Sequence, residues 1–131
     1  MTPIVHPRDV DDPRPVLADV GGRWMVHGFS CAQCGYRLAA ERPVCPICRS
    51  AIEPHEFGPG GVVWSATVVR VGVPDRATPL GLAYVDLDDG PRVLCHFGGD
   101  APDAFLAALA PGSRVELAGL TQLGDPQVRV V

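Results

Sequence analysis

The sequence contains no lysine, few aromatic residues and no long apolar run. All 11 basic residues among its 131 are Arg, they form no cluster, and the net charge is −4. Proteins that bind nucleic acid concentrate basic side chains on one face, so nucleic acid is not expected as the main partner. No stretch approaches the roughly 20 apolar residues of a membrane span, and the first residues lack the apolar core of a signal peptide. These absences predict a cytoplasmic protein.

The short length and the abundance of turn-forming residues limit the fold. A chain of 131 residues holds one ordinary domain or two very small ones, which argues against a large catalytic core. Aromatic residues make up 6%, against 15 Gly and 14 Pro, and this balance favours a mainly β chain broken by turns. The odd number of cysteines, 5, indicates ligands or buried thiols and not a disulfide framework.

Four of the cysteines form two closely spaced pairs. Cys31 and Cys34 are separated by two residues, as are Cys45 and Cys48, and ten residues lie between the pairs. Two such turns complete a tetrahedron of sulfurs, and Gly35 allows backbone amides to approach them, so we expect one metal ion, zinc, bound by all four. Because four thiolates leave no open coordination position, the metal is expected to be structural.

A redox pair and an iron site are the two alternatives to zinc for these cysteines. A thioredoxin-like redox pair needs a βαβ context that the sequence lacks, and it leaves the second pair without a role. Iron is the closer alternative to zinc, because both pairs also resemble the iron loops of rubredoxin. The ten-residue spacer is short for that site, so iron is the less expected metal.

The chain divides into three predicted segments. Residues 1–22 are rich in Pro and Asp and are expected to be a tail, ordered only if it lies on the rest of the protein or on a partner. Residues 23–57 form a small rubredoxin-like zinc ribbon, and residues 58–131 form a β-domain. A Gly-Pro-Gly-Gly stretch, 58–61, marks the bend between the last two.

The β-domain is predicted to contain five strands and one short helix. The first strand should be buried on much of both faces, and residues 88–91 should form a hairpin turn. A helix over 100–109 would be capped by Asp100. This count matches a partly open barrel of the OB type, with an SH3-like barrel as the alternative. The strands are expected at 62–73, 80–87, 92–97, 114–120 and 127–131.

The remaining reactive side chains form no recognisable catalytic pattern. Cys95 alternates with apolar residues and is expected to be a buried, inert thiol. The four histidines are dispersed, and the acidic residues near Gly90 are interpreted as turn formers and not as a calcium site. Arg92 is expected to be solvated, with a CoA phosphate as the alternative partner. Four aromatic residues are expected in the core, with an interface role as the alternative: Trp24, Phe57, Tyr36 and Trp64.

Taken together, these motifs resemble the acyl-CoA-associated family that joins a rubredoxin-like zinc ribbon to an OB-fold, domain of unknown function family thirty-five. The resemblance covers about 23–120, and the order of the motifs is more specific than the cysteines alone. The chain departs from the family at its start, where a Pro/Asp-rich segment replaces an aromatic-rich helix. The matching stretches are the two cysteine pairs, Arg42-Pro43, Gly61–Val69, Leu82–Leu87, Gly90–Arg92 and Pro111–Val115.

The resemblance implies a non-catalytic accessory subunit. Such a subunit binds a thiolase-like enzyme, a thiolase-type aldolase or a hydratase that acts on acyl-CoA, sometimes helps to shape the substrate pocket, and serves lipid or sterol metabolism. The implied assembly is a hetero-oligomer with structural zinc. The alternatives are a nucleic-acid-binding ribbon and OB-fold, which the acidity disfavours, and a free-standing acyl-CoA-binding protein.

Overall fold

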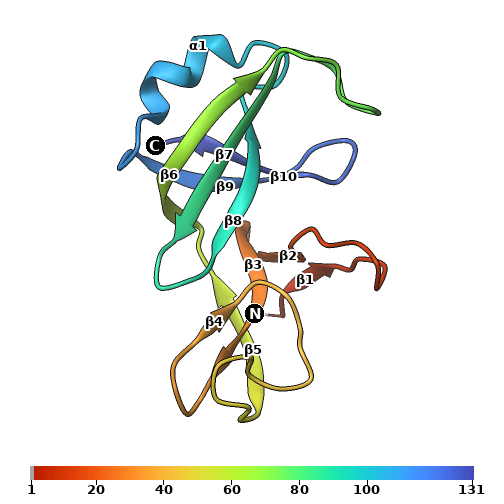
Figure 1. Cartoon of the computed structure of the whole chain (residues 1–131), viewed down its shortest axis with the longest axis vertical. Helices are drawn as coiled ribbons and strands as arrows, with labels where there is room; N and C mark the ends of the chain where they lie inside the picture. The colour runs from red at the N-terminus through yellow and green to blue at the C-terminus, as the bar shows by residue number, and fades with distance from the viewer. Residues whose placement is uncertain (1) are drawn as a thin grey trace.

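The computed structural model describes residues 2–131 and is built almost entirely of β-strands. Figure 1 shows two units stacked along the long axis, a small sheet that contains β1 to β5 below and a barrel of β6 to β10 above. The chain passes from one to the other where β5 (Ile52–Phe57) leads directly into β6 (Gly60–Val69). The two units are therefore joined by a short, glycine-rich bend.

The lower sheet is organised around its longest strand, β3. This strand pairs antiparallel with β2, β4 and β5, and β1 extends the sheet beyond β2. Gly28 in β3 has no room for a side chain, because a Cβ there would meet the Leu38 carbonyl oxygen and the Phe57 ring. Besides β5, the strands of this sheet are β1 (Ile4–His6), β2 (Leu17–Val20), β3 (Arg23–Cys31) and β4 (Arg37–Leu38).

The N-terminal segment, expected to be a tail that is ordered only on the rest of the protein or on a partner, lies on the rest of the protein as a pair of strands. Residues Leu17 to Val20 pair with Val26 to Arg23, and both Leu17 and Ala18 are fully buried. The Pro- and Asp-rich composition of the segment does not predict this strand pairing, because a short apolar stretch at Leu17 is enough to form a strand beside β3. The boundaries of the three predicted segments remain a proposal, but residues 4–20 belong to the sheet that carries the cysteines.

The upper unit is a closed five-stranded barrel. Around the barrel the strands follow the order β10-β8-β7-β6-β9, and β10 pairs parallel with β8 and antiparallel with β9. This order, with a helix between the third and fourth strands, is that of an OB-fold and confirms the predicted fold over the SH3-like alternative. The bounds are β7 (Leu80–Leu87), β8 (Arg92–Phe97), β9 (Arg114–Leu120) and β10 (Pro126–Val130).

The first barrel strand differs from its prediction in its bounds and in its burial. It covers Gly60–Val69, whereas the strand was expected over 62–73. We expected burial on both faces, but a β-bulge lies between Val63 and Ser65, so the inward-facing set shifts by one residue. Val63 is buried before the bulge, and Ala66 and Val68 pack on the core after it. Trp64, the extra residue of the bulge, is 51% exposed. The strand is therefore buried on one face only.

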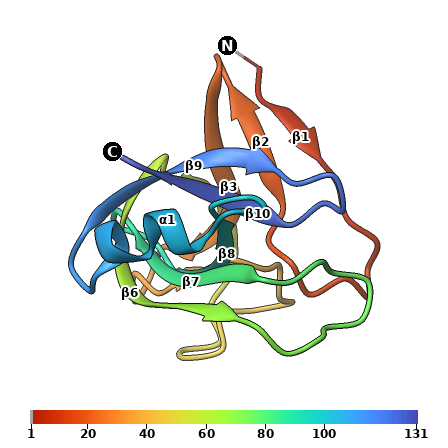
Figure 2. The ribbon, with the colours of Figure 1, turned by 90° about the horizontal axis from the view of Figure 1, so that it is seen from above.

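The helical segment is shorter than predicted. Helix α1 (Asp103–Leu106) continues as a 3-10 turn, η1 (Ala107–Leu109), and its N-cap is Pro102, without a side-chain cap. Asp100 therefore does not cap it. Figure 2 shows α1 lying across the end of the barrel, where Leu109 enters the core. No helix in residues 2–131 has the length and apolar character needed to cross a membrane.

The hydrophobic core runs from the barrel into the lower sheet. Three buried residues of the lower sheet, Leu17, Val26 and Phe57, belong to the same cluster as the barrel core. Trp24 packs against this cluster, and a Cβ at Gly119 of β9 would lie only 3.2 Å from its ring. The two units therefore share buried surface and are not independent modules on a flexible linker.

Candidate metal centre

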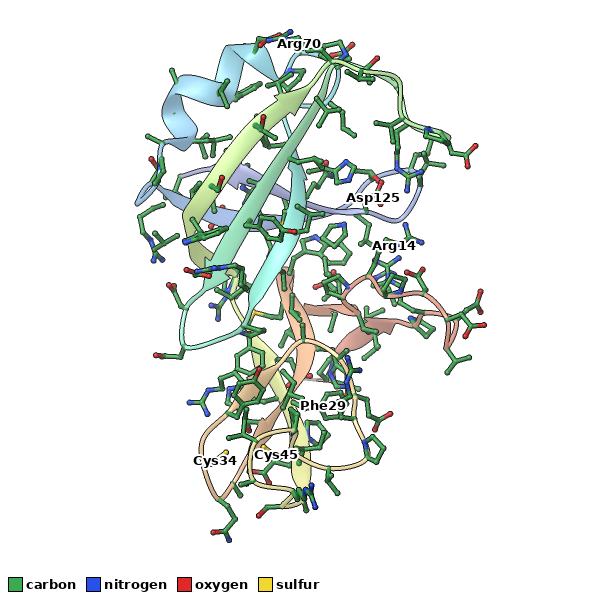
Figure 3. The ribbon with its side chains drawn as sticks, in the orientation of Figure 1. Arg14, Phe29, Cys34, Cys45, Arg70 and Asp125 are labelled. Atoms are coloured by element: carbon green, nitrogen blue, oxygen red, sulfur yellow. The ribbon has the colours of Figure 1, made fainter. Side chains whose placement is uncertain are left out.

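The structure brings the four predicted cysteines together at the end of the lower sheet farthest from the barrel. Cys31 ends β3, Cys34 lies in the turn before β4, and Cys45 and Cys48 lie in the loop between β4 and β5 (Figure 3). All four sulfurs lie within 4.8 Å of one another. Among the described residues, no other group of three or more Cys, His, Asp or Glu side chains is arranged to hold a metal.

The spacing of the sulfurs fits a tetrahedral ion. The Cys31 and Cys48 sulfurs are 3.4 Å apart, and those of Cys34 and Cys45 are 3.6 Å apart. Four sulfurs about 2.3 Å from a central zinc would lie roughly 3.8 Å from one another. The residues present therefore fit a metal bound by four thiolates.

The two cysteine loops have the same backbone design. In the first, the Gly35 amide donates to the Cys31 carbonyl oxygen at 2.9 Å, and in the second the Arg49 amide donates to the Cys45 carbonyl oxygen at 2.9 Å. Both residues have a positive φ, 76° for Gly35 and 65° for Arg49. This turn suits glycine, so the second loop holds its position at the cost of some backbone strain.

Backbone amides approach the sulfurs in both loops. The Cys34 amide donates to the Cys31 sulfur at 3.5 Å, and the Ile47 amide donates to the Cys45 sulfur at 3.4 Å. Hydrogen bonds from the Ser50 side chain and amide lower the pKa of the Cys48 thiol to about 6. These donors stabilise negative charge on sulfur, which is what a thiolate-bound metal centre requires.

The other thiol and two of the histidines pack against neighbouring side chains, whereas His27 and His96 lie beside carboxylates. Cys95 is fully buried in the barrel core, and its burial raises the pKa of the thiol to about 12. His6 lies against Trp24, and His55 stacks on Phe57. Among residues 2–131, no hydrogen bond joins a histidine to a Ser, Thr or Cys side chain.

Two of the three acidic residues around the β7–β8 hairpin, Asp86 and Asp88, pair with arginines. The Asp86 carboxylate accepts bonds from Arg92 at 2.7 and 3.1 Å, and that of Asp88 accepts two from Arg114, each at 2.7 Å. The negative charges of these two carboxylates are therefore compensated by arginines of the same chain. The predicted turn is present, because the Gly90 amide donates to the Leu87 carbonyl oxygen at 2.9 Å.

Two features were not predicted. The first is an exposed aromatic face on the barrel, where Trp64 lies edge-on to Tyr84 and the Arg92 guanidinium lies 3.9 Å from the Trp64 ring centroid. Trp64 and Tyr36 were expected in the core, but both are exposed, whereas Phe57 is buried as expected. The bulge at Trp64 carries no sequence signal that distinguishes it from a regular strand.

The second unpredicted feature is a buried carboxylate that joins three distant segments. Asp125 accepts bonds from Arg76 at 2.8 and 3.0 Å and from Arg14 at 3.2 Å, and His96 lies 3.6 Å away. Figure 3 shows Arg14 beside Asp125, between the lower sheet and the barrel. No local pattern in the sequence predicts this site, because the partners of Asp125 are far apart along the chain.

Comparisons with known proteins agree with this architecture. The family model of the ChsH2 C-terminal OB-fold domain matches residues 55–120, about half of the chain. One chain of the solved Ltp2-ChsH2(DUF35) aldolase matches over 81% of this chain and 84% of its own length, with a TM-score of 0.63 and 27% identity. The chain belongs to the DUF35 family. The predicted resemblance is thereby confirmed.

A curated protein is also similar in sequence to this chain. This DUF35 chain is 38% identical over 72 residues to a DUF35 domain-containing scaffold protein of Pyrococcus furiosus. The alignment covers 53% of this chain and 53% of the relative, so the chain spans about half the length of that protein. The solved structure is named as an Ltp2-ChsH2(DUF35) aldolase, and the relative is named as a scaffold protein.

Proposed function

We propose that the protein is a non-catalytic accessory subunit that binds and stabilises a thiolase-like enzyme or thiolase-type aldolase acting on acyl-CoA. The observation that carries the proposal is the match over most of the chain to one chain of the Ltp2-ChsH2(DUF35) aldolase. The scaffold relative supports the same role. In this role the two units provide binding surfaces. The four cysteines would bind a structural metal ion and leave no coordination position open for a substrate.

A structural zinc ion is part of this proposal. Four thiolates match the preference of zinc for sulfur ligands, and they fill the coordination sphere of an ion that does not need a substrate position. When bound, zinc would fix the two cysteine loops against each other through Cys31, Cys34, Cys45 and Cys48. Elemental analysis should find one zinc per chain, and a red iron-containing preparation would contradict this choice.

The exposed aromatic face supports binding to a protein partner. Tyr84 is paired across the sheet with Ser65 on β6 and with Leu94 on β8, and Trp64 lies beside it. Trp64, Tyr84 and Leu94 are 51%, 45% and 40% exposed, although large apolar side chains are usually buried. Clustered exposed aromatics of this kind are typical of interface centres.

Co-expression with thiolase-like proteins encoded beside this chain tests the proposal. We expect a stable hetero-oligomer in size-exclusion chromatography with light scattering, and a higher melting temperature of the enzyme in the complex. Trp64→Ser should weaken the complex by at least about tenfold. Val71→Ser is the matched control, because Val71 is also exposed but lies in a loop outside this face.

Two outcomes would contradict the accessory role. Turnover of acyl-CoA by the purified chain alone, at the rate of the co-expressed pair, would show an enzyme or a free-standing acyl-CoA protein. Failure of every thiolase-like neighbour to associate would remove the proposed partner. The cytoplasmic location remains a prediction, which fractionation of the native host would test.

A further inference from the structure

The cysteine loops face the β7–β8 hairpin of the barrel across a groove. Figure 1 shows this hairpin pointing from the barrel toward the lower sheet. The groove has a volume of about 830 Å³, its walls are residues 35–40 and 90–92, and Arg37, Arg42 and Arg92 line it. A side chain that bridges the groove can therefore transmit a change in the cysteine loops to the hairpin.

Arg37 is the side chain that bridges it. Its Nη1 donates to the Gly35 carbonyl oxygen at 2.9 Å, and its Nε donates to the Asp89 carbonyl oxygen at 2.9 Å. Gly35 belongs to the first cysteine loop, where its amide donates to the Cys31 carbonyl oxygen. Among the described residues, no other hydrogen bond and no ion pair joins residues 31–50 to the barrel.

The hairpin turn that receives this bond needs support from outside. Asp89 has a φ of 52°, a left-handed conformation that costs more for Asp than for glycine. Arg37 fixes the carbonyl group of this residue. The next residue, Gly90, lies so close to Phe57 of the lower sheet that a Cβ there would be 2.9 Å from the Phe57 side chain. The turn is thus positioned by the lower unit and not by the barrel alone.

The hairpin in turn positions the exposed aromatic face. Arg92 is the first residue of β8 after the turn, and it pairs across the strands with Asp86. Its guanidinium lies 3.9 Å from the centroid of the Trp64 ring, and Trp64 lies edge-on to Tyr84. A change in the turn therefore reaches the aromatic face through Arg92.

We propose that the β7–β8 hairpin and the exposed aromatic face are fully ordered only while the four cysteines hold a metal ion, and that Arg37 is the positioning residue for this coupling. A bound metal would fix the first cysteine loop and with it the Gly35 carbonyl group, so that Arg37 is held in place to reach Asp89. When that loop unfolds, the turn loses this donor. The consequence that the enzyme partner prefers the metal-loaded chain rests on the proposed function.

Hydrogen exchange resolved by residue, on the metal-loaded and the metal-free full chain, tests the coupling. The Gly90 amide reports the hairpin, because it donates to the Leu87 carbonyl oxygen at 2.9 Å. The Gly124 amide is the internal control, because it donates to the Thr121 carbonyl oxygen at 2.9 Å in the other barrel turn, outside the groove. We expect metal removal to accelerate exchange at Gly90 by at least about tenfold and at Gly124 by less than about twofold.

Substitution of Arg37 should remove the response to the metal. Arg37 is exposed, so Arg37→Met should fold, and it keeps a long side chain without a donor. We expect Gly90 in metal-loaded Arg37→Met to exchange as fast as in the metal-free wild type, and metal removal to add less than about twofold. Arg37→Lys keeps one donor group and should restore part of the metal dependence.

Arg42→Met is the matched control variant. Arg42 lines the same groove and loses the same charge, but it donates only to the carbonyl oxygen of the adjacent Glu41. We expect it to respond to metal removal as the wild type does. A merely structural role of Arg37 would instead accelerate exchange at Gly90 and Gly124 alike and leave the response to the metal unchanged.

Three results would overturn the proposal. The first is exchange at Gly90 that is the same with and without metal, and the second is equal acceleration at Gly90 and Gly124. The third is an Arg37→Met variant that responds to metal removal as strongly as the wild type. The NMR signal of the Trp64 indole must also move on metal removal, because an unchanged signal would exclude the aromatic face from the coupling.

The coupling and the accessory role can fail separately. We expect the dissociation constant of the complex with the thiolase-like partner to rise by about tenfold for the metal-free chain and for Arg37→Met, but not for Arg42→Met. An affinity that is independent of the metal, together with faster exchange at Gly90, would overturn the effect on binding. No complex with the metal-loaded wild type would instead contradict the proposed function, while the exchange experiment would still decide the coupling.

Discussion

The cysteine loops and the barrel are stabilised in different ways. The barrel buries a continuous aliphatic core, with members on every one of its strands. The cysteine loops bury little besides Leu38 and two of the cysteines, Cys31 and Cys45. Structural zinc in such loops contributes on the order of 10 kcal/mol, in place of the hydrophobic burial that a short loop cannot supply. One fold thus combines loops with little buried apolar surface and a barrel with a continuous core.

Removal of the metal should have the largest effect on stability, and this effect should differ between the cysteine loops and the barrel. We expect chelation, or Cys31→Ser, to unfold the cysteine loops over 31–50 while the barrel remains folded. Hydrogen exchange resolved by residue is the measurement. Cys95→Ala is the matched control, because it should leave the metal content at one per chain and destabilise the barrel by about 1–2 kcal/mol. Unchanged exchange in the loops after chelation would contradict the difference between the regions.

Replacement of Phe57 should show how far the regions depend on each other. Phe57 is buried in the shared core, beside Gly90 of the hairpin. We expect Phe57→Ala to cost about 3–5 kcal/mol in the free energy of unfolding and to lower the melting temperature of both regions together. Phe57→Leu should recover part of this loss. Separate transitions for sheet and barrel would show that the shared core does not couple them.

Loss of Asp125 should give a smaller effect at the contact between the N-terminal segment and the barrel. Asp125→Asn leaves Arg14 and Arg76 without their carboxylate, and we expect a loss of about 1–3 kcal/mol by urea denaturation. Hydrogen exchange should increase first in residues 4–20. Unchanged protection there would mean that β-sheet pairing alone holds the segment.

The same carboxylate predicts how stability depends on pH. Burial alone would raise the pKa of Asp125, but hydrogen bonds from Arg76 and Arg14 and the charge of His96 outweigh it, so the pKa is lowered. The stabilisation is therefore present above pH about 4 and is lost as the pH falls through the folded pKa. Burial lowers the pKa of His96, so protonation of the unfolded chain below pH about 6.5 also reduces stability. Asp125→Asn should flatten the acid limb of this profile.

The exposed ion pair at the far end of the barrel should matter least. Arg70 pairs with Asp103 at the surface, where water screens both charges. We expect Asp103→Asn to leave the denaturation midpoint unchanged within error, in low and in high salt. A clear loss of stability in low salt would mean that this pair anchors α1 to the barrel.

Local patterns predicted the elements whose causes lie close together in the sequence. Strands Leu80–Leu87 and Arg92–Phe97 were placed correctly because the turn between them, with Gly90, is specified by adjacent residues. The burial of Cys95 followed from alternation along one strand. The pairing of Leu17 with Val26 was missed, because it depends on a partner strand and not on the composition of the segment.

By itself, the sequence determined that the four cysteine sulfurs form one site, that the barrel is an OB-fold, and which family the chain belongs to. Each of these depends on the spacing and order of motifs along the chain. The tertiary structure alone decided that Trp64 is exposed, that Asp125 is buried among distant arginines, and that Arg37, Arg42 and Arg92 line one groove. The physical reason is that exposure and charge compensation depend on which segments meet in space. Those contacts follow from folding of the whole chain and leave no periodic signal in any one part of it.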